Sequence, residues 1–143
     1  MSLLVLDASV AVLWVEPSST NRLTQSAVQL LQRYVSREVE LMVPDIFWAE
    51  VANALSKGIR QRRWEREAAE EAIADLMAYN FDTVSSLLLL PEALPITLKY
   101  GISVYDCLHV ALALQAKADL ITADERLANA LAARFPVKWL GAM

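Results

Sequence analysis

The chain has 143 residues, of which 56% are hydrophobic and 21% are charged. This balance indicates a globular protein and excludes a disordered chain, and the length predicts one domain, residues 1–143. No apolar run approaches the roughly 20 residues that span a bilayer, and a single cysteine excludes an internal disulfide and a cysteine-based zinc cluster. We therefore expect a cytoplasmic protein without a membrane partner.

The net charge is -4 and the isoelectric point is about 5.0. A protein that binds duplex nucleic acid through a broad basic face usually carries the opposite charge. A nucleic-acid substrate is still compatible with this charge, because acids gathered in one site lower the net charge while bound metal ions reverse the local field.

Apolar runs and helical periodicity alternate along the chain. Strands are predicted at 3–6, 40–43, 81–84, 118–122 and 137–140, and helices at 20–34, 46–60, 65–79, 103–117 and 124–134. This alternation predicts an α/β fold with a parallel sheet between two helical layers. The segment 85–100 has a helical pattern that ends well at Gly101, but Pro91 and Pro95 interrupt it, so its structure stays open.

Acidic residues stand where predicted strands end and where predicted helices begin. Asp7 follows the first strand, and Asp124 lies just past the strand at 118–122. Asp106 is near the start of the helix at 103–117, and Glu50 is in the first turns of the helix at 46–60. The carboxyl edge of a parallel sheet is where ligands bind, and the alternation of strands and helices brings all these acids to that edge.

Carboxylates that converge without basic partners repel one another, and a divalent cation removes the conflict. An all-oxygen site of this kind suits Mg²⁺ or Mn²⁺, which keep waters for a phosphate substrate. Such a metal activates water and stabilises the charge of an in-line phosphoryl displacement. The residues alone therefore indicate a metal-dependent phosphodiesterase.

Four stretches resemble, in order and spacing, the motifs of PIN-domain nucleases, and most of all the VapC-type toxins of toxin–antitoxin pairs: LLVLDAS, VPDIFWAEVANAL, ISVYDCLHVALA and DLITADERL. The resemblance implies a three-layer α/β/α fold with about five parallel strands in the order 3-2-1-4-5. It also implies endonucleolytic cleavage of RNA by metal-activated water, with Mg²⁺ or Mn²⁺ as cofactor. The implied partners are the RNA substrate, a cognate antitoxin protein and a second copy in a homodimer.

By the same resemblance, the catalytic and metal-binding residues are Asp7, Glu50, Asp106 and Asp124. Ser9 and Thr122 stand where the family often has a hydroxyl near the metal, and we treat both as second-rank candidates for the site.

Each of the four acids also has an ordinary structural interpretation, which for Glu50 is that of a surface acid. Asp7 and Asp124 could cap the helices that follow them, and Asp106 could interact with its own helix dipole. Three further acids, Asp45, Asp82 and Asp119, fit turn or cap positions better than a site. His109 shares the helix face of Asp106, but a lone histidine in an apolar helix is usually a core or interface group.

The stretch KGIRQRRWER, residues 57–66, places several arginines around one tryptophan. Arginine forks and an aromatic plane suit single-stranded RNA or an antitoxin, and the residues concerned are Arg60, Arg62, Arg63 and Trp64. A solvated turn between two helices is the competing interpretation.

Four other functions compete with the toxin nuclease. A phosphoacceptor receiver domain needs paired acids after its first strand, and Asp7 has no acidic neighbour. A Ser-His-Asp hydrolase lacks its nucleophile motif here. A PIN nuclease that processes RNA without being a toxin, or a catalytically silent PIN binding module, stays open.

Overall fold

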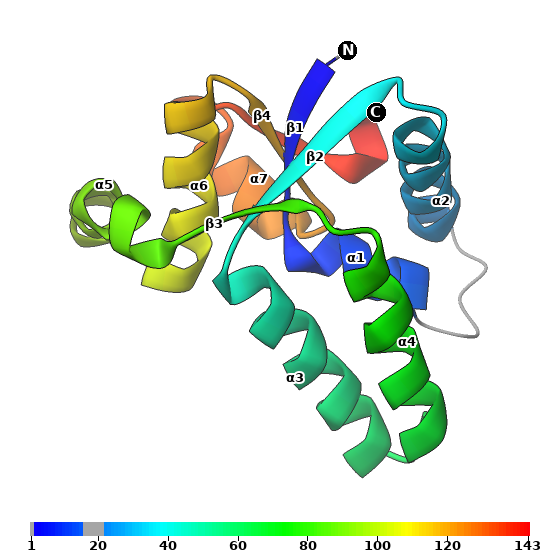
Figure 1. Ribbon diagram of the computed structural model, residues 1–143. Coiled ribbons are helices and arrows are strands. Elements are labelled where there is room, and N and C mark those ends of the chain that lie inside the picture. The colour runs from blue at the N-terminus through cyan, green and yellow to red at the C-terminus, as the bar shows by residue number, and fades with distance from the viewer. Residues whose placement is uncertain (1, 16–21) are drawn as a thin grey trace.

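The computed structural model describes residues 2–15 and 22–143, and strands alternate with helices as predicted (Figure 1). The strands are β1 (Ser2–Leu6), β2 (Val39–Pro44), β3 (Asp82–Val84), β4 (Asp119–Thr122) and β5 (Val137–Trp139). The helices are α1 (Ala8–Val15), α2 (Arg22–Val35), α3 (Ile46–Arg60), α4 (Arg66–Ala78), α5 (Ser86–Tyr100), α6 (Val104–Ala116) and α7 (Glu125–Leu131), and a 3₁₀ turn, Leu140–Ala142, follows β5. The first residues of the helix predicted at 20–34 lie outside the described part of the chain.

The strands form one parallel sheet in the order β3-β2-β1-β4-β5, so the predicted order 3-2-1-4-5 is confirmed. β1 lies in the centre and pairs with β2 on one side and β4 on the other. A central strand is covered on both faces, which is why its sequence is continuously apolar rather than alternating.

Helices cover both faces of this sheet, which confirms the three-layer arrangement. Leu4 and Leu6 of β1 pack into a core with α1, α2, α3 and α4, whereas Val5 between them packs into a second core with α5, α6 and α7. Successive side chains of a strand point to opposite faces, so one short strand contributes to both cores. The side chains of Val5 and Leu6 are fully buried.

α5 is one continuous helix despite its two prolines. The Ser85 hydroxyl caps its start by accepting a hydrogen bond from the Leu87 N–H at 3.2 Å, and Gly101 ends it in the left-handed conformation at φ 68°. Pro91 and Pro95 are four residues apart and exposed, while the buried side packs on the core through Leu89, Ala93 and Ile96. Packing of this buried side outweighs the hydrogen bonds that the prolines remove.

α6 is the most deeply buried helix of the described chain, with buried side chains at every position from 107 to 113. A helix that is apolar on all sides belongs either to a core or to a membrane. α6 has 13 residues, and none of the helices within 2–15 and 22–143 combines the length and apolarity needed to cross a bilayer.

Candidate functional site

Two neighbouring strands deliver acids to the same edge of the sheet. Asp7 follows β1 directly, and its backbone N–H donates to the carbonyl of Ile121 in β4 at 3.0 Å. Asp124 stands two residues past the end of β4, at the start of α7. β1 and β4 are parallel neighbours, so their carboxyl ends meet there, as the sequence analysis predicted.

Asp7 is buried, with 6% of its surface exposed, and its carboxylate is held by two hydroxyls. Ser9 Oγ donates to Asp7 Oδ2 at 2.6 Å, and Thr122 Oγ1 donates to the same oxygen at 2.8 Å. These hydroxyls in turn accept the backbone N–H groups of Ala123 and Asp124, at 2.9 and 3.0 Å. Ser9 and Thr122 therefore orient the Asp7 carboxylate and join the ends of β1 and β4 around it.

The other oxygen of Asp7 faces a histidine that the sequence analysis placed among core residues. His109 of α6 is fully buried, and its Nε2 lies 3.6 Å from Asp7 Oδ1 and 2.7 Å from Glu50 Oε1. Burial alone lowers the pKa of His109, but the Glu50 hydrogen bond and the charges of Asp7, Glu50 and Asp106 outweigh it, so the pKa is raised. The histidine is a core group, and it is also part of the acid cluster.

Asp7, Glu50 and His109 come from three different parts of the fold: Asp7 directly follows β1, Glu50 lies on α3 and His109 on α6. One potential ligand atom from each lies within 4.8 Å of the other two, which is close enough for a single metal ion. Glu50 is the most accessible of the three, with 28% of its side chain exposed.

Asp106 lies between this cluster and Asp124. It lines one cavity of about 440 Å³ together with Glu50, and a second of about 360 Å³ together with Asp124. Burial raises the pKa of Asp106, and the negative charge of Asp7 raises it further, against an opposing hydrogen bond from Ser103. The carboxylates therefore repel one another in the metal-free protein, and a cation would relieve that repulsion.

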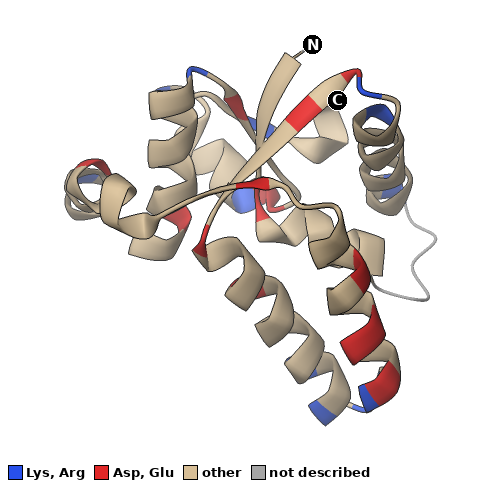
Figure 2. Cartoon of the chain, in the orientation of Figure 1, with Lys and Arg blue, Asp and Glu red and all other residues tan. Residues whose placement is uncertain are grey.

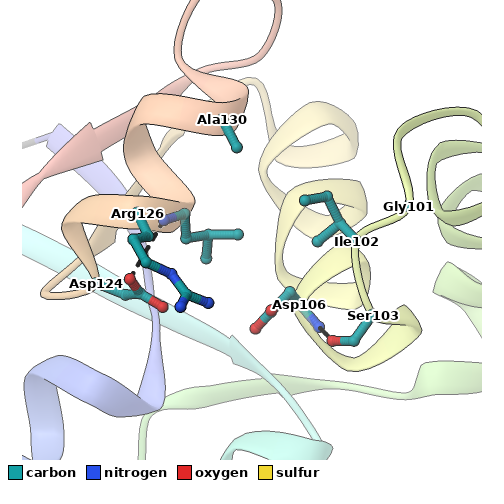
Figure 3. A pocket seen from close by; sticks show the side chains of 8 residues that line it. Gly101, Ile102, Ser103, Asp106, Asp124, Arg126 and Ala130 are labelled. Atoms are coloured by element: carbon teal, nitrogen blue, oxygen red, sulfur yellow. Dashed lines mark hydrogen bonds between the residues drawn. The ribbon is translucent and has the colours of Figure 1, made fainter.

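Asp124 caps a helix and also lines the cavity, so its position is compatible with both a structural and a site role. Its Oδ1 caps α7 by accepting the Leu127 N–H at 3.3 Å, and the residue also lines the cavity that contains Asp106. Both carboxylates point into this cavity in Figure 3. Capping engages one carboxylate oxygen, and the other has no hydrogen bond within the described residues.

The same cavity contains a basic residue that the sequence analysis did not single out. Arg126, on α7, is exposed, and its side chain points into the cavity beside Asp124 (Figure 3). Within residues 2–15 and 22–143, Arg126 forms no ion pair. The sequence signal that could have singled out Arg126 is its position, two residues after Asp124 on a helix that starts at the site.

The arginines of KGIRQRRWER lie elsewhere, at the turn between α3 and α4 (Figures 1 and 2). Arg60 is ten positions after Glu50 on α3, or about 15 Å along the helix. Trp64 is half-buried against Gly58, where its indole leaves no room for a side chain. The structure thus brings neither Arg60 nor Trp64 to the acids.

The remaining acids have structural partners. The Asp45 carboxylate accepts the Ser86 N–H at 3.1 Å, which ties the start of α3 to the start of α5. Asp119 forms an ion pair with Lys138 at 3.0 Å, and Asp82 is exposed on β3. Asp45 therefore agrees with the cap interpretation, whereas Asp82 and Asp119 are the first residues of strands β3 and β4 rather than turn or cap residues.

The raised pKa of Asp106 predicts that its charge destabilises the metal-free fold at neutral pH. The cost is complete above the folded-state pKa and disappears as the pH falls below the ordinary value of 3.8, because the carboxyl is then protonated in the folded and in the unfolded chain alike. In EDTA, we expect Asp106→Asn to raise the melting temperature at pH 7 by about 2–4 °C, equivalent to about 1 kcal/mol in a domain of this size.

Circular dichroism melts of wild type and Asp106→Asn from pH 7 to pH 4 measure this effect, and the difference should shrink with falling pH. Asp82→Asn, at an exposed position, is the matched control and should show little change. A lower melting temperature for Asp106→Asn at pH 7 would contradict the prediction.

Comparison with known proteins gives concordant results. The family model described as "PIN domain" matches residues 4–131. Ribonuclease VapC3 of Pyrobaculum aerophilum is 32% identical over 129 residues, covering 88% of this chain and 92% of that protein. Among solved structures, PAE2754 from Pyrobaculum aerophilum matches with a TM-score of 0.72 and 17% sequence identity, over 99% of this chain and 91% of that chain. A toxin-antitoxin complex from Klebsiella pneumoniae matches with a TM-score of 0.63 and 17% sequence identity, over 96% of each chain. With its sheet order and its acids at the carboxyl edge, the chain belongs to the PIN domain family.

Proposed function

We propose that this protein is a metal-dependent endoribonuclease of the VapC type, the toxin of a toxin–antitoxin pair. The observation that carries the proposal is the convergence of Asp7, Glu50, Asp106 and Asp124 at one edge of the sheet, in a chain similar to a protein named as a ribonuclease. Three of these residues, Asp7, Asp106 and Asp124, hold the metal, and Glu50 helps to position it or the attacking water.

The donor set fits Mg²⁺ or Mn²⁺, because the available carboxylate oxygens are hard ligands and His109 Nε2 is already engaged by Glu50. When bound, such a metal lowers the pKa of water and offsets charge on a transferring phosphoryl group. The chain itself supplies preorganisation. Ser9 and Thr122 fix one oxygen of Asp7 and leave the other directed toward Glu50 and His109.

The first test removes one carboxylate at a time. Asp7→Asn keeps an oxygen for the Ser9 and Thr122 hydroxyls but loses the charge, so the fold should survive. We expect cleavage of a labelled single-stranded RNA to fall at least about 100-fold, since even outer residues of metal sites cost 10–100-fold. EDTA should abolish wild-type cleavage, and added Mg²⁺ or Mn²⁺ should restore it.

Asp82→Asn is the control and should cut at the wild-type rate. The assignment of Asp7 collapses if Asp7→Asn cuts as fast as wild type. A wild-type protein that cuts no RNA even with Mn²⁺ would instead be a silent PIN binding module.

Arg126 is the candidate contact for the substrate. A cavity lined by Asp106 and Asp124 repels RNA phosphates unless positive charge is present, and Arg126 supplies it from the same cavity without an acidic partner in the described chain. A guanidinium binds phosphate through two parallel hydrogen bonds. We infer that Arg126 binds a phosphate of the RNA next to the cleaved bond.

Arg126→Gln should raise the KM for RNA about tenfold, the equivalent of losing one charge-assisted hydrogen bond, with a smaller effect on kcat. Arg62→Gln, at the turn between α3 and α4, is the matched substitution and should leave KM unchanged. The opposite pattern would place the RNA on the α3–α4 turn and overturn the Arg126 assignment. Steady-state kinetics of both variants on one RNA at fixed Mg²⁺ measure KM and kcat and so distinguish the two binding sites.

A protein partner is the second part of the proposal. A similar structure is a toxin-antitoxin complex, and α5 exposes an apolar surface that includes Leu87, Leu94 and Leu98, each more than half exposed. Surfaces of this kind mark protein–protein contacts. We propose an antitoxin and a second copy of the chain as the partners.

Expression in a bacterial host tests the toxin assignment. The wild-type chain should arrest growth, Asp106→Asn should not, and co-expression of the protein encoded by the neighbouring reading frame should restore growth. If the wild type cuts RNA in the test tube but leaves growth unaffected, the protein is a PIN nuclease of RNA processing and the toxin assignment is wrong. Sedimentation of the purified chain measures whether it forms a dimer.

A further inference from the structure

His109 is a buried histidine that links two of the proposed site carboxylates. It lies on α6, between Glu50 of α3 and Asp7 at the end of β1, with Nε2 at 2.7 Å from Glu50 Oε1 and 3.6 Å from Asp7 Oδ1. We infer that His109 is a positioning residue that holds the Glu50 carboxylate in place for the metal through an Nε2–H hydrogen bond. This inference deepens the proposed function and rests on it.

The hydrogen bond fixes the role of the imidazole. An ionised carboxylate can only accept, so the Nε2 of His109 must carry the proton that joins it to Glu50. A nitrogen that carries a proton has no lone pair for a metal. Although Nε2 lies close enough to Asp7 and Glu50 to be considered a ligand atom, the geometry makes it a donor to a ligand instead.

The surroundings of His109 speak against a purely structural role. Its helical neighbours Leu108 and Val110 are buried and apolar, and the Nδ1 of His109 has no hydrogen-bond partner within the described residues. A buried polar atom without a partner costs stability, so an apolar side chain would suit the core better. Glu50 is partly exposed and could bond to water, so it does not need the histidine for its own solvation.

Preorganisation of the Glu50 carboxylate explains why the core keeps a histidine whose buried Nδ1 has no hydrogen-bond partner within the described residues. A glutamate side chain has several rotatable bonds, and a carboxylate that is already oriented loses less freedom when a metal binds. Residues that orient metal ligands from behind typically change metal affinity 10–100-fold when they are removed. His109 reaches Glu50 from another helix, 59 residues along the chain, so only the folded protein makes this contact.

Three substitutions separate positioning from ligation and from core packing. His109→Gln places an amide N–H near the position of Nε2 and keeps the donor. His109→Leu fills the space without a donor, and His109→Asn has a donor too short to reach Glu50. The measurement is Mn²⁺ binding to the purified protein, followed by the electron paramagnetic resonance of free Mn²⁺, with melting temperatures in EDTA as the test of folding.

We expect His109→Leu and His109→Asn to weaken Mn²⁺ binding by about 10–100-fold, and His109→Gln to stay within about threefold of wild type. In a Glu50→Ala background, His109→Leu should have little further effect, because the side chain through which His109 acts is already gone. Saturating Mn²⁺ should restore most of the cleavage rate of His109→Leu.

Other outcomes overturn the inference. If His109→Gln and His109→Leu lose the same Mn²⁺ affinity, the imidazole is a direct metal ligand. If the His109 variants change the melting temperature but not the Mn²⁺ affinity, His109 is a core residue only. Additive losses in the Glu50→Ala background show that His109 does not act through Glu50. A wild-type protein that binds Mn²⁺ and cuts RNA leaves the proposed function standing in each case, whereas one that does neither overturns both.

Discussion

The burial of the Asp7 carboxylate is the constraint on which the rest of the site depends. Burying a charge is costly unless partners surround it, and the partners of Asp7 come from across the fold. Ser9 lies in the first turn of α1, Thr122 ends the neighbouring strand, and His109 approaches from α6. Each can do so only because β1 is the central strand of a parallel sheet, with β4 beside it and α6 packed on one face.

The same arrangement leaves the site with an excess of negative charge. Asp106 is half-buried, and the charge of Asp7 opposes its ionisation. Arg126 lines part of the space but forms no ion pair in the described chain. The metal-free fold therefore carries electrostatic strain at the place where a cation is proposed to bind. Such a trade of stability for function is common at active sites.

Much of the fold, and the edge of the sheet at which the acids lie, could be predicted from the sequence because the informative signals are local. A continuous apolar run ending in Asp7, and the run before Asp124, predicted strand ends and hence one shared edge. α5 could not be predicted with the same ease, since its continuity depends on tertiary packing of Leu89 and Ala93 rather than on local propensity.

The contact between His109 and Glu50 could not be predicted for a related reason. The apolar neighbours of His109 predicted its burial correctly, but its hydrogen bond joins residues of two helices that approach each other only in the folded chain. The place of Arg126 beside the acids could not be predicted either, because an arginine early in a helix is ordinary on its own. Its meaning comes from the cavity it shares with Asp106, on a different helix.

The helix cap made by Asp124 affects how substitutions at this position should be interpreted. The carboxylate fastens the first turn of α7 through Leu127, and removing a capping side chain costs about 1 kcal/mol in typical helices. An alanine at this position combines that loss with the loss of charge, so an alanine scan would overstate its chemical importance. Asparagine or serine keeps the cap. For the helix, the position requires only a small oxygen-bearing side chain, and any stricter requirement for an acid must come from chemistry.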